Sequence, residues 1–331
     1  MAVTLKDVAE LAGVSRSAVS RTYTEGASVS VKTRDKVMRA ASSLGYSPNA
    51  LASSLTTGRT KMIGLVSNNF HNPVFLEVFD LFTRGLHERD LRPLLVNLTD
   101  ETDPDASVQM LRQYSVDGVI VASSTLPPAF AKAFGDANLP VVHSFGRHYE
   151  NPAVDVLGID NIAAGRLAAR TLIEHGYSRV AFLGGPETAT STLDREKGFL
   201  SEVAKQPGVT ATTTFASAYS FEAGHSEMTA LLRARPAEAY FCADDVLSIG
   251  AMSALQDKGF DVPRDVGLIG LNDMKMASWA NVNLTTIHNP FPDIIAASID
   301  RVAALVEDRS IVPQARLFDC SVVHRGTLKK Q

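Results

Sequence analysis

The sequence has only two cysteines, Cys242 and Cys320, which lie far apart and form no Cys-x-x-Cys or Cys/His spacing. This argues against a disulfide framework and favours two inert thiols in a reducing compartment. No stretch approaches the ~20 apolar residues of a membrane helix. The opening residues, MAVTLKDVAE, also lack the basic and apolar regions of a secretory signal. We therefore predict a cytoplasmic protein without a membrane segment.

Catalytic signatures are also missing. The segments FLGGPE and GLIGLND end apolar runs in glycine-containing turns, but neither has the GxGxxG or GxxxxGK[ST] spacing of a phosphate-binding loop. There is no nucleophile elbow and no metal-ligand spacing. The sequence thus predicts no enzyme, no cofactor and no metal, although Asp/His pairs gathered in a pocket stay an alternative that sequence alone leaves open.

Charge is distributed unevenly along the 331 residues, whose formal net charge is −4. Residues 1–59 carry eight Lys or Arg against four acids, a net charge of +4, and the remainder therefore carries −8. A basic head on an acidic body indicates a polyanionic partner for the head. A solvated basic face is the alternative. The length predicts two or three domains.

The stretch TLKDVAELAGVSRSAVSRTYT, residues 4–24, predicts two short helices joined by a tight turn. Thr4 followed by Asp7 is a capping-box start, and Gly13 suits the positive φ that ends a helix. Ser15 is placed to cap a second helix that runs to about Tyr23. This arrangement is what a helix-turn-helix requires, with its second helix free to enter a major groove.

Helical spacing divides the second helix into two faces. Val19 and Thr22 point inward, and the opposite face is polar. The polar side chains placed to reach DNA are Arg16, Ser17, Ser20 and Arg21, together with the cap Ser15.

A third helix is predicted from the cap Ser30 to Gly45, completing a minimal three-helix head. The residues expected to face the first two helices are Val31, Val37, Ala40, Ala41 and Leu44. The alternative is a helical hairpin that only packs on a larger domain, with Arg16 and Arg21 as solvated charges.

In their order along the chain, TLKDVAELAGVSRSAVSR, VSVKTRDKV, LGYSPNALASSLTTGRT and IGLV resemble the LacI/GalR family of bacterial transcriptional regulators, over essentially the whole chain. The resemblance implies a repressor that binds a near-palindromic operator as a homodimer under allosteric control by a small effector. It implies an all-α head and hinge helix joined to an α/β core like periplasmic binding proteins, with two subdomains of parallel, doubly wound sheets. The expected boundaries are 1–47 (head), 48–60 (hinge), 61–159 with 290–318 (first subdomain), and 160–289 with 319–331 (second subdomain).

Further DNA contacts follow from the resemblance. On the sequence alone, residues 49–55 are too short for a stable helix and would be a flexible linker. In the family such a segment folds when two chains pair on DNA, with Leu55 as the wedge in the minor groove and Ala52 small enough to fit beside it. The implied DNA-binding residues outside the second helix are Thr4, Leu5, Asn49, Ala52 and Leu55. The family usually has Asn at Thr24 and often Arg at Ser53, so the resemblance does not carry the usual contacts of these two positions over to this chain.

From Lys61 onward, short apolar runs alternate with helical patterns, which predicts parallel sheets covered by helices. The candidate strands are residues 62–67, 93–98, 117–122, 140–145, 156–160, 179–185, 239–243 and 265–271. Ligands in such folds bind at the carboxyl ends of the strands. The chain ends without leucine heptads, so we expect a dimer rather than a tetramer assembled by a coiled coil.

The strand ends therefore supply the candidate effector contacts, chosen because polyols need bidentate polar groups and flat apolar rings. They are Phe70, Phe75, Arg147, Arg195, Tyr219, Asp244 and Asn272. By family position Arg195 is the first choice. The family usually has Asp at Asn272, which leaves room for an acidic or amide-bearing ligand with Arg147 and Arg195 as counter-charges. A sugar, polyol or sugar acid is the predicted effector.

Structural roles compete with these assignments. Both Phe70 and Phe75 are of a type more often found in a core, Asp244 can cap a helix, and Arg147 can be a solvated charge. His143, in an apolar strand, is expected to be a hydrogen-bonded core residue. A transport-associated sugar-binding protein would share the body, but it would have no use for the basic head.

Overall fold

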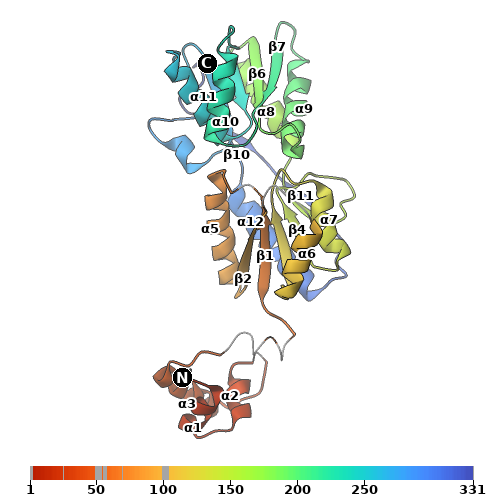
Figure 1. Cartoon of the computed structure of the whole chain (residues 1–331), viewed down its shortest axis with the longest axis vertical. Coiled ribbons are helices and arrows are strands. Elements are labelled where there is room, and N and C mark those ends of the chain that lie inside the picture. Colours follow the sequence, from red (N-terminus) through yellow and green to blue (C-terminus); the bar gives the residue numbers. More distant parts are fainter. Residues whose placement is uncertain are drawn as a thin grey trace. The chain divides into compact units, whose positions relative to one another are not determined.

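The chain forms two compact units, residues 1–60 and 61–331, in a computed structural model (Figure 1). The structure describes residues 3–24, 26–48, 54, 58–68, 70–98 and 104–330. The predicted hinge contacts Asn49, Ala52 and Leu55 lie outside the described residues. No described helix is long and apolar enough to cross a membrane.

The first unit is a three-helix head. Its helices are α1 (Leu5–Ala12), α2 (Arg16–Thr22) and α3 (Val31–Leu44). The predicted capping box is confirmed, since the Thr4 hydroxyl accepts from the Asp7 N–H and the Asp7 carboxylate accepts from the Thr4 N–H at 2.7 Å. Gly13 ends α1 at φ 66° and Gly45 ends α3 at φ 64°, as predicted.

The head has its own small core, in which Val8, Val19 and Val37 are fully buried. The prediction that Val31 faces this core is wrong, because its side chain is 75% exposed. At 3.6 residues per turn, Val31 lies roughly 120° around α3 from Val37, and the buried stripe passes it by.

The second unit contains two lobes, each built on a six-stranded sheet. The first lobe has the order β11-β5-β4-β3-β1-β2, all parallel. Its strands are β1 (Met62–Ser67), β2 (Arg92–Asn97), β3 (Gly118–Ala122), β4 (Val141–Ser144), β5 (Asp155–Ile159) and β11 (Ala315–Phe318). Its helices are α5 (Val74–Glu88), α6 (Pro104–Gln113), α7 (Pro128–Asp136) and α12 (Phe291–Glu307).

Apolar side chains point alternately to the two faces of the central strands, which explains why helices cover both faces of this sheet (Figure 1). Ile63 and Leu65 of β1 join the core with α5 and α12, whereas Val66 joins the core with α6 and α7. Successive side chains point to opposite faces of a strand, so a continuous apolar run buries both faces.

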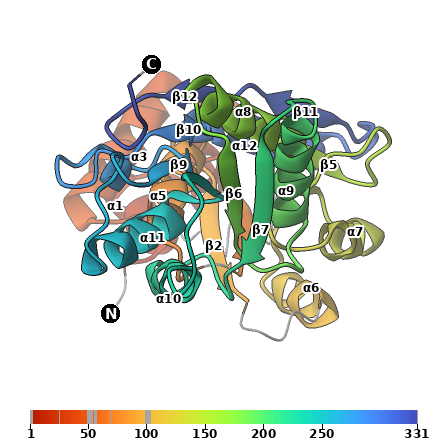
Figure 2. The same ribbon diagram turned by 90° about the horizontal axis from the view of Figure 1, so that it is seen from above.

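The second lobe has the order β12-β10-β9-β8-β6-β7, parallel except for the antiparallel pair β10–β12. Its strands are β6 (Arg179–Gly184), β7 (Thr210–Phe215), β8 (Ala239–Cys242), β9 (Gly267–Asn272), β10 (Thr286–His288) and β12 (Ser321–Val323). Its helices are α8 (Asn161–Glu174), α9 (Thr190–Val203), α10 (Phe221–Leu231), α11 (Asp245–Asp257) and the 3₁₀ helix η1 (Lys275–Ser278). Figure 2 shows α8 and α9 on one side of β6 and β7 and α10 and α11 on the other.

All eight predicted strands are present, each within two residues of its expected bounds. Four strands, β7, β10, β11 and β12, were not predicted from the sequence. β7 reads TATTTF and is an edge strand with no apolar run, and β10 and β12 are only three residues long. The chain passes between the lobes after β5, after β10 and between β11 and β12. The carboxyl ends of the parallel strands of each sheet point toward the other lobe (Figure 1).

Candidate functional site

The polar face of α2 is open to solvent. Its exposed residues are Ser15, Arg16, Ser17, Ser20 and Arg21, whereas Val19 and Thr22 are buried on the opposite side. The Ser15 hydroxyl accepts from the Ala18 N–H at 3.2 Å and shares a hydrogen bond with the Ser17 hydroxyl. Within the part of the head that the structure describes, neither Arg16 nor Arg21 forms an ion pair with a carboxylate.

The other two described residues of the predicted DNA-binding set lie at the start of α1. Thr4 is exposed, and its hydroxyl belongs to the capping box. Leu5 is half-buried and packs against the head core. Both therefore have local structural roles, and their contacts with DNA stay predictions.

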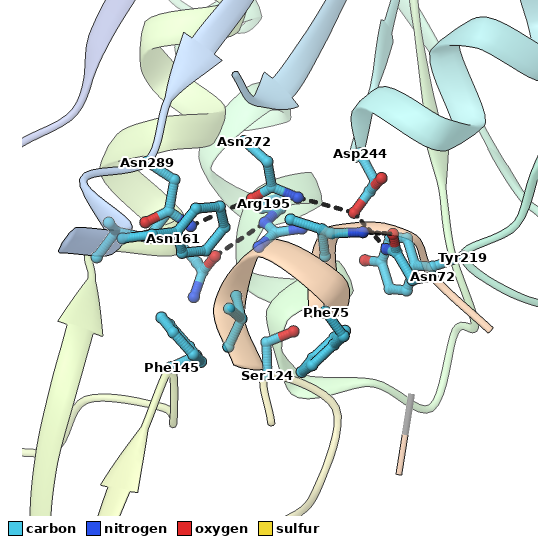
Figure 3. A pocket seen from close by; sticks show the side chains of 14 residues that line it. Asn72, Phe75, Ser124, Phe145, Asn161, Arg195, Tyr219, Asp244, Asn272 and Asn289 are labelled. Carbon is cyan, nitrogen blue, oxygen red and sulfur yellow. Dashed lines mark hydrogen bonds between the residues drawn. The ribbon is translucent and has the colours of Figure 1, made fainter. Parts of the chain in front are cut away.

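A cavity lies between the two lobes of the second unit and encloses about 530 Å³, counting its open mouth. Residues after several strand ends line it (Figure 3). They are Asn72, Val74, Phe75, Val78, Ser124, Phe145, Ile159, Asn161, Arg195, Tyr219, Asp244, Asn272, Asn289 and Phe291. Five of the seven predicted effector residues are among them: Phe75, Arg195, Tyr219, Asp244 and Asn272.

Arg195, on α9, is the cation of this cavity and is only 4% exposed. Its Nε donates to Asn161 Oδ1 at 2.8 Å, and its Nη1 donates to the Ala243 carbonyl at 2.7 Å. These two bonds hold the guanidinium plane in place and leave Nη2 free of any described protein acceptor.

Asp244 caps α11, as the structural alternative predicted, and it also lines the cavity. Its Oδ1 accepts from the Val246 N–H at 2.8 Å, and its Oδ2 accepts from Asn72 Nδ2 at 2.9 Å and Asn272 Nδ2 at 2.8 Å. Burial raises the pKa of Asp244 to about 6, against the opposing effect of these donors and of Arg195. The carboxylate is therefore largely ionised at neutral pH.

The neighbouring Asp245 is also fully buried, and it accepts from the Thr286 hydroxyl and from the Met274 N–H at 2.8 Å. Burial, together with the adjacent Asp244, raises the pKa of Asp245 to about 7. Because Asp245 does not line the cavity, we assign it to the support of the loop after β9.

That loop has an unusual backbone. Asn272 and Asp273 have φ of 121° and 56°, conformations that non-glycine residues rarely adopt. Surrounding bonds hold them: Asp273 pairs with Arg325 at 2.6 Å and with His288 at 3.0 Å. Such local strain is typical of functional loops. Here it turns the Asn272 side chain toward Asp244 (Figure 3).

Tyr219 lies at one end of the cavity, where its hydroxyl and that of Thr192 are 2.6 Å apart. Phe75 supplies an aromatic surface from α5, and Phe145 and Phe291 pack edge-to-face at 5.6 Å. The cavity therefore combines flat apolar rings with convergent amides, one arginine and one carboxylate.

Two predicted effector residues lie outside this lining. Phe70 is half-buried and packs on Phe79, with ring centroids 4.8 Å apart. Arg147 forms an ion pair with the nearly buried carboxylate of Asp194 across the cleft. Arg147 therefore already has a carboxylate partner, and its role as a counter-charge for an acidic ligand stays a prediction. His143 is a core residue as expected, 1% exposed and bonded to the Ser123 carbonyl.

Three asparagines that line the cavity were not predicted from the sequence: Asn72, Asn161 and Asn289. Asn161 directly follows β5 and the cap Asp160, so the strand-end rule that selected the other residues also applies to it. Asn289 follows β10, a strand too short to recognise. Asn72 bonds to Asp244 over 172 residues of sequence, a distance that local patterns do not bridge.

Each of the two compact units contains a region that matches a known protein family. The family described as "Bacterial regulatory proteins, lacI family" matches residues 4–49, and "Periplasmic binding protein-like domain" matches residues 169–328. The HTH-type transcriptional repressor PurR of Proteus mirabilis (strain HI4320) is 32% identical over 87% of this chain and 85% of its own length.

Solved structures show the same fold. A lac repressor dimer bound to operator and the anti-inducer ONPF superposes with a TM-score of 0.88, at 24% identity and full coverage of both chains. The transcriptional regulator CelR in complex with cellobiose has a TM-score of 0.72 at 26% identity, covering 98% of this chain and 100% of that one.

Proposed function

Because this chain belongs to the LacI family of bacterial regulatory proteins and is a DNA-binding transcriptional repressor rather than an enzyme, we propose that it binds a near-palindromic operator as a homodimer under the control of a small effector. The observation that carries the DNA-binding part is the exposed face of α2 and its N-cap, which holds two arginines and three serines at the surface of a basic head; neither arginine pairs with a carboxylate among the described residues. We place its site of action in the cytoplasm.

In this proposal α2 enters the major groove, with Arg16 and Ser17 reaching base edges and Ser15, Ser20 and Arg21 positioning the backbone. The two hinge segments pair in the minor groove, where Leu55 opens a base step beside Ala52. These assignments rest on the exposed face of α2 and on the family resemblance of the hinge.

For the cavity we propose a neutral, hydroxylated effector such as a sugar or polyol. Arg195 and Asp244 are the only charged residues among the fourteen that line the cavity, and their charges balance. A sugar acid is disfavoured because Arg147 is already neutralised by Asp194. The cellobiose bound by the related CelR supports a carbohydrate.

Control by the effector follows from the position of the cavity between the lobes. A ligand that binds one arrangement of the lobes better than another shifts the population of the two arrangements. By linkage, an effector that weakens DNA binding must itself bind the DNA complex more weakly, by the same factor.

A gel-shift assay with full-length protein tests this function directly. Binding to a preferred duplex should fall steeply with salt, as counterion release requires. A panel of sugars, polyols and sugar acids should then contain a neutral compound that changes the affinity for that duplex. If no duplex is preferred and none shows salt-sensitive binding, the proposed function is wrong.

Replacing Arg16 with alanine should relax the base preference at one operator position. A guanidinium that donates two hydrogen bonds to a base edge contributes about 1–3 kcal/mol of discrimination. Selection of binding sites from a random duplex pool measures the change. The matched control is Arg39→Ala, which removes a charge from α3, where the guanidinium donates to its own helix at Asp35.

The Arg39 variant should weaken binding to every sequence alike, or leave it unchanged. An Arg16 variant that selects the wild-type motif would show that this side chain contacts the backbone only.

A further inference from the structure

Four polar side chains form one continuous chain of hydrogen bonds across the cavity (Figure 3). Asn289 Nδ2 donates to Asn272 Oδ1 at 3.2 Å, Asn272 Nδ2 donates to Asp244 Oδ2 at 2.8 Å, and Asn72 Nδ2 donates to the same oxygen at 2.9 Å. All four side chains are buried, with exposed fractions of 2–6%. We call this chain of four residues the amide relay.

The carboxylate gives the amide relay a direction. An ionised carboxylate only accepts hydrogen bonds, so each amide beside it must present its NH₂ group. Asn272 therefore turns its oxygen away from Asp244, and Asn289 must meet that oxygen with its own NH₂ group. Asn72 is held independently, since its Oδ1 also accepts from the Val74 N–H at 3.1 Å.

The relay ends in an unsatisfied acceptor. Asn289 Oδ1, on the side away from Asn272, is buried and accepts no hydrogen bond from any described residue (Figure 3). A buried polar atom without a partner costs about 1–3 kcal/mol, so such atoms normally meet a partner. Asn289 lines the cavity, so an effector that opens the packing over its Oδ1 can supply the missing donor.

We propose, building on the effector role of this cavity, that Asn289 selects effectors carrying an O–H or N–H donor at this position, and that the single carboxylate of Asp244 sets the preference by orienting Asn272 and Asn289. Arg195 offers the opposite polarity, a donor for an effector oxygen. A hydroxylated compound satisfies both ends, whereas a carboxylate directed at Asn289 does not.

The same carboxylate joins the two lobes. Asn72 precedes α5 in the first lobe, and Asp244 precedes α11 in the second. Any effector group that turns Asp244 therefore also disturbs a hydrogen bond across the cleft. This makes Asp244 a positioning residue for both effector choice and lobe closure.

The direction that Asp244 imposes on the Asn272 amide is tested without any ligand. The measurement is thermal unfolding of the full-length protein at pH 8, where Asp244 is ionised. Asn272→Asp places a second carboxylate 2.8 Å from the first, and we expect the melting temperature to fall by several degrees. In the double variant with Asp244→Asn one charge remains, and most of this loss should be recovered.

The matched control is Asp245→Asn, which removes an equally buried charge that bonds to Thr286 and Met274 instead of Asn272. It should relieve the Asn272→Asp loss much less than Asp244→Asn does. The relay would be overturned if Asp244→Asn and Asp245→Asn recovered the melting temperature of Asn272→Asp equally. It would also be overturned if the losses of the single variants simply added in the double variant. A double variant no more stable than Asn272→Asp alone would overturn it as well.

Effector choice is tested by calorimetric titration with cellobiose, D-glucose, xylitol and sodium D-gluconate. A neutral probe that binds the wild type should bind Asn289→Leu at least roughly tenfold more weakly, and equal affinity overturns the role of Asn289. Gluconate bound more tightly than every neutral probe would also overturn it. If none of the four binds the wild type, the proposed carbohydrate class fails, and the relay is judged by the unfolding experiment.

Discussion

Replacing Gly198 with alanine should destabilise the second lobe by about 3 kcal/mol, the upper end of the range for an overpacked core. A Cβ atom at this position would lie 2.0 Å from the Ile162 carbonyl oxygen and 3.0 Å from the Ile162 Cα. Both are backbone atoms of α8, so the clash cannot be relieved by a side-chain rotation. The helix propensity gained by alanine, about 1 kcal/mol at most, does not offset it.

The contact is reciprocal, because a Cβ at Gly165 of α8 would lie 2.0 Å from the Arg195 carbonyl oxygen on α9. The two glycines let the helices touch backbone to backbone and so set the position of Arg195 in the cavity. Separating α8 from α9 should therefore also weaken effector binding.

Urea unfolding of the full-length protein measures the loss as a lower midpoint. The control is Gly85→Ala in α5, where the new Cβ would meet only side-chain ends, the Ile299 Cδ1 at 2.7 Å and the Arg89 Nη1 at 3.9 Å. That variant should remain within about 1 kcal/mol of the wild type. Equal stability of the two variants would mean that α8 and α9 can separate at little cost.

Arg195→Ala should abolish the effector response and leave operator binding intact. The change removes the only cation among the described residues that line the cavity. It also leaves Asn161 Oδ1 and the Ala243 carbonyl without their donor and deprives Asp244 of its counter-charge. Hydrogen bonds from a charged group contribute about 1.5–3 kcal/mol each, so effector affinity should fall roughly a hundredfold. DNA binding should persist because the head is a separate compact unit with its own core.

The measurement is a titration of the operator complex with the compound that alters wild-type binding in the gel-shift panel. Arg170→Ala is the control, since this exposed arginine of α8 pairs with Glu202 away from the cavity. The control should respond like the wild type. A normal response from the Arg195 variant would show that the effector binds elsewhere.

Much of the fold could be predicted because its signals are local. The Thr4–Asp7 capping box, the terminal glycines of the head helices and the apolar runs of the central strands all act within a few residues of sequence. The edge strand β7 and the three-residue strands β10 and β12 gave no such signal, because they are formed through pairing with strands already in place. Val31 was misplaced because apolarity alone does not say which side of a helix is covered.

The site was predictable only in outline. Strand ends pointed to Arg195, Asp244 and Asn272, which all line the cavity, since the carboxyl ends of parallel strands meet at one edge. Nothing local showed that Arg147 faces Asp194, or that Asn72 reaches Asp244 from the other lobe. These pairings depend on how two lobes meet, which the chain decides by passing between them three times.

By itself the sequence determined the class of protein: a basic helix-turn-helix head on an acidic α/β body, because helix periodicity, caps and charge are written residue by residue. Only the tertiary structure decided which polar groups face one another in the cavity and in which direction their hydrogen bonds run. The physical reason is that a buried carboxylate orients amides that come from distant parts of the chain. These hydrogen bonds exist only once the two lobes have packed together.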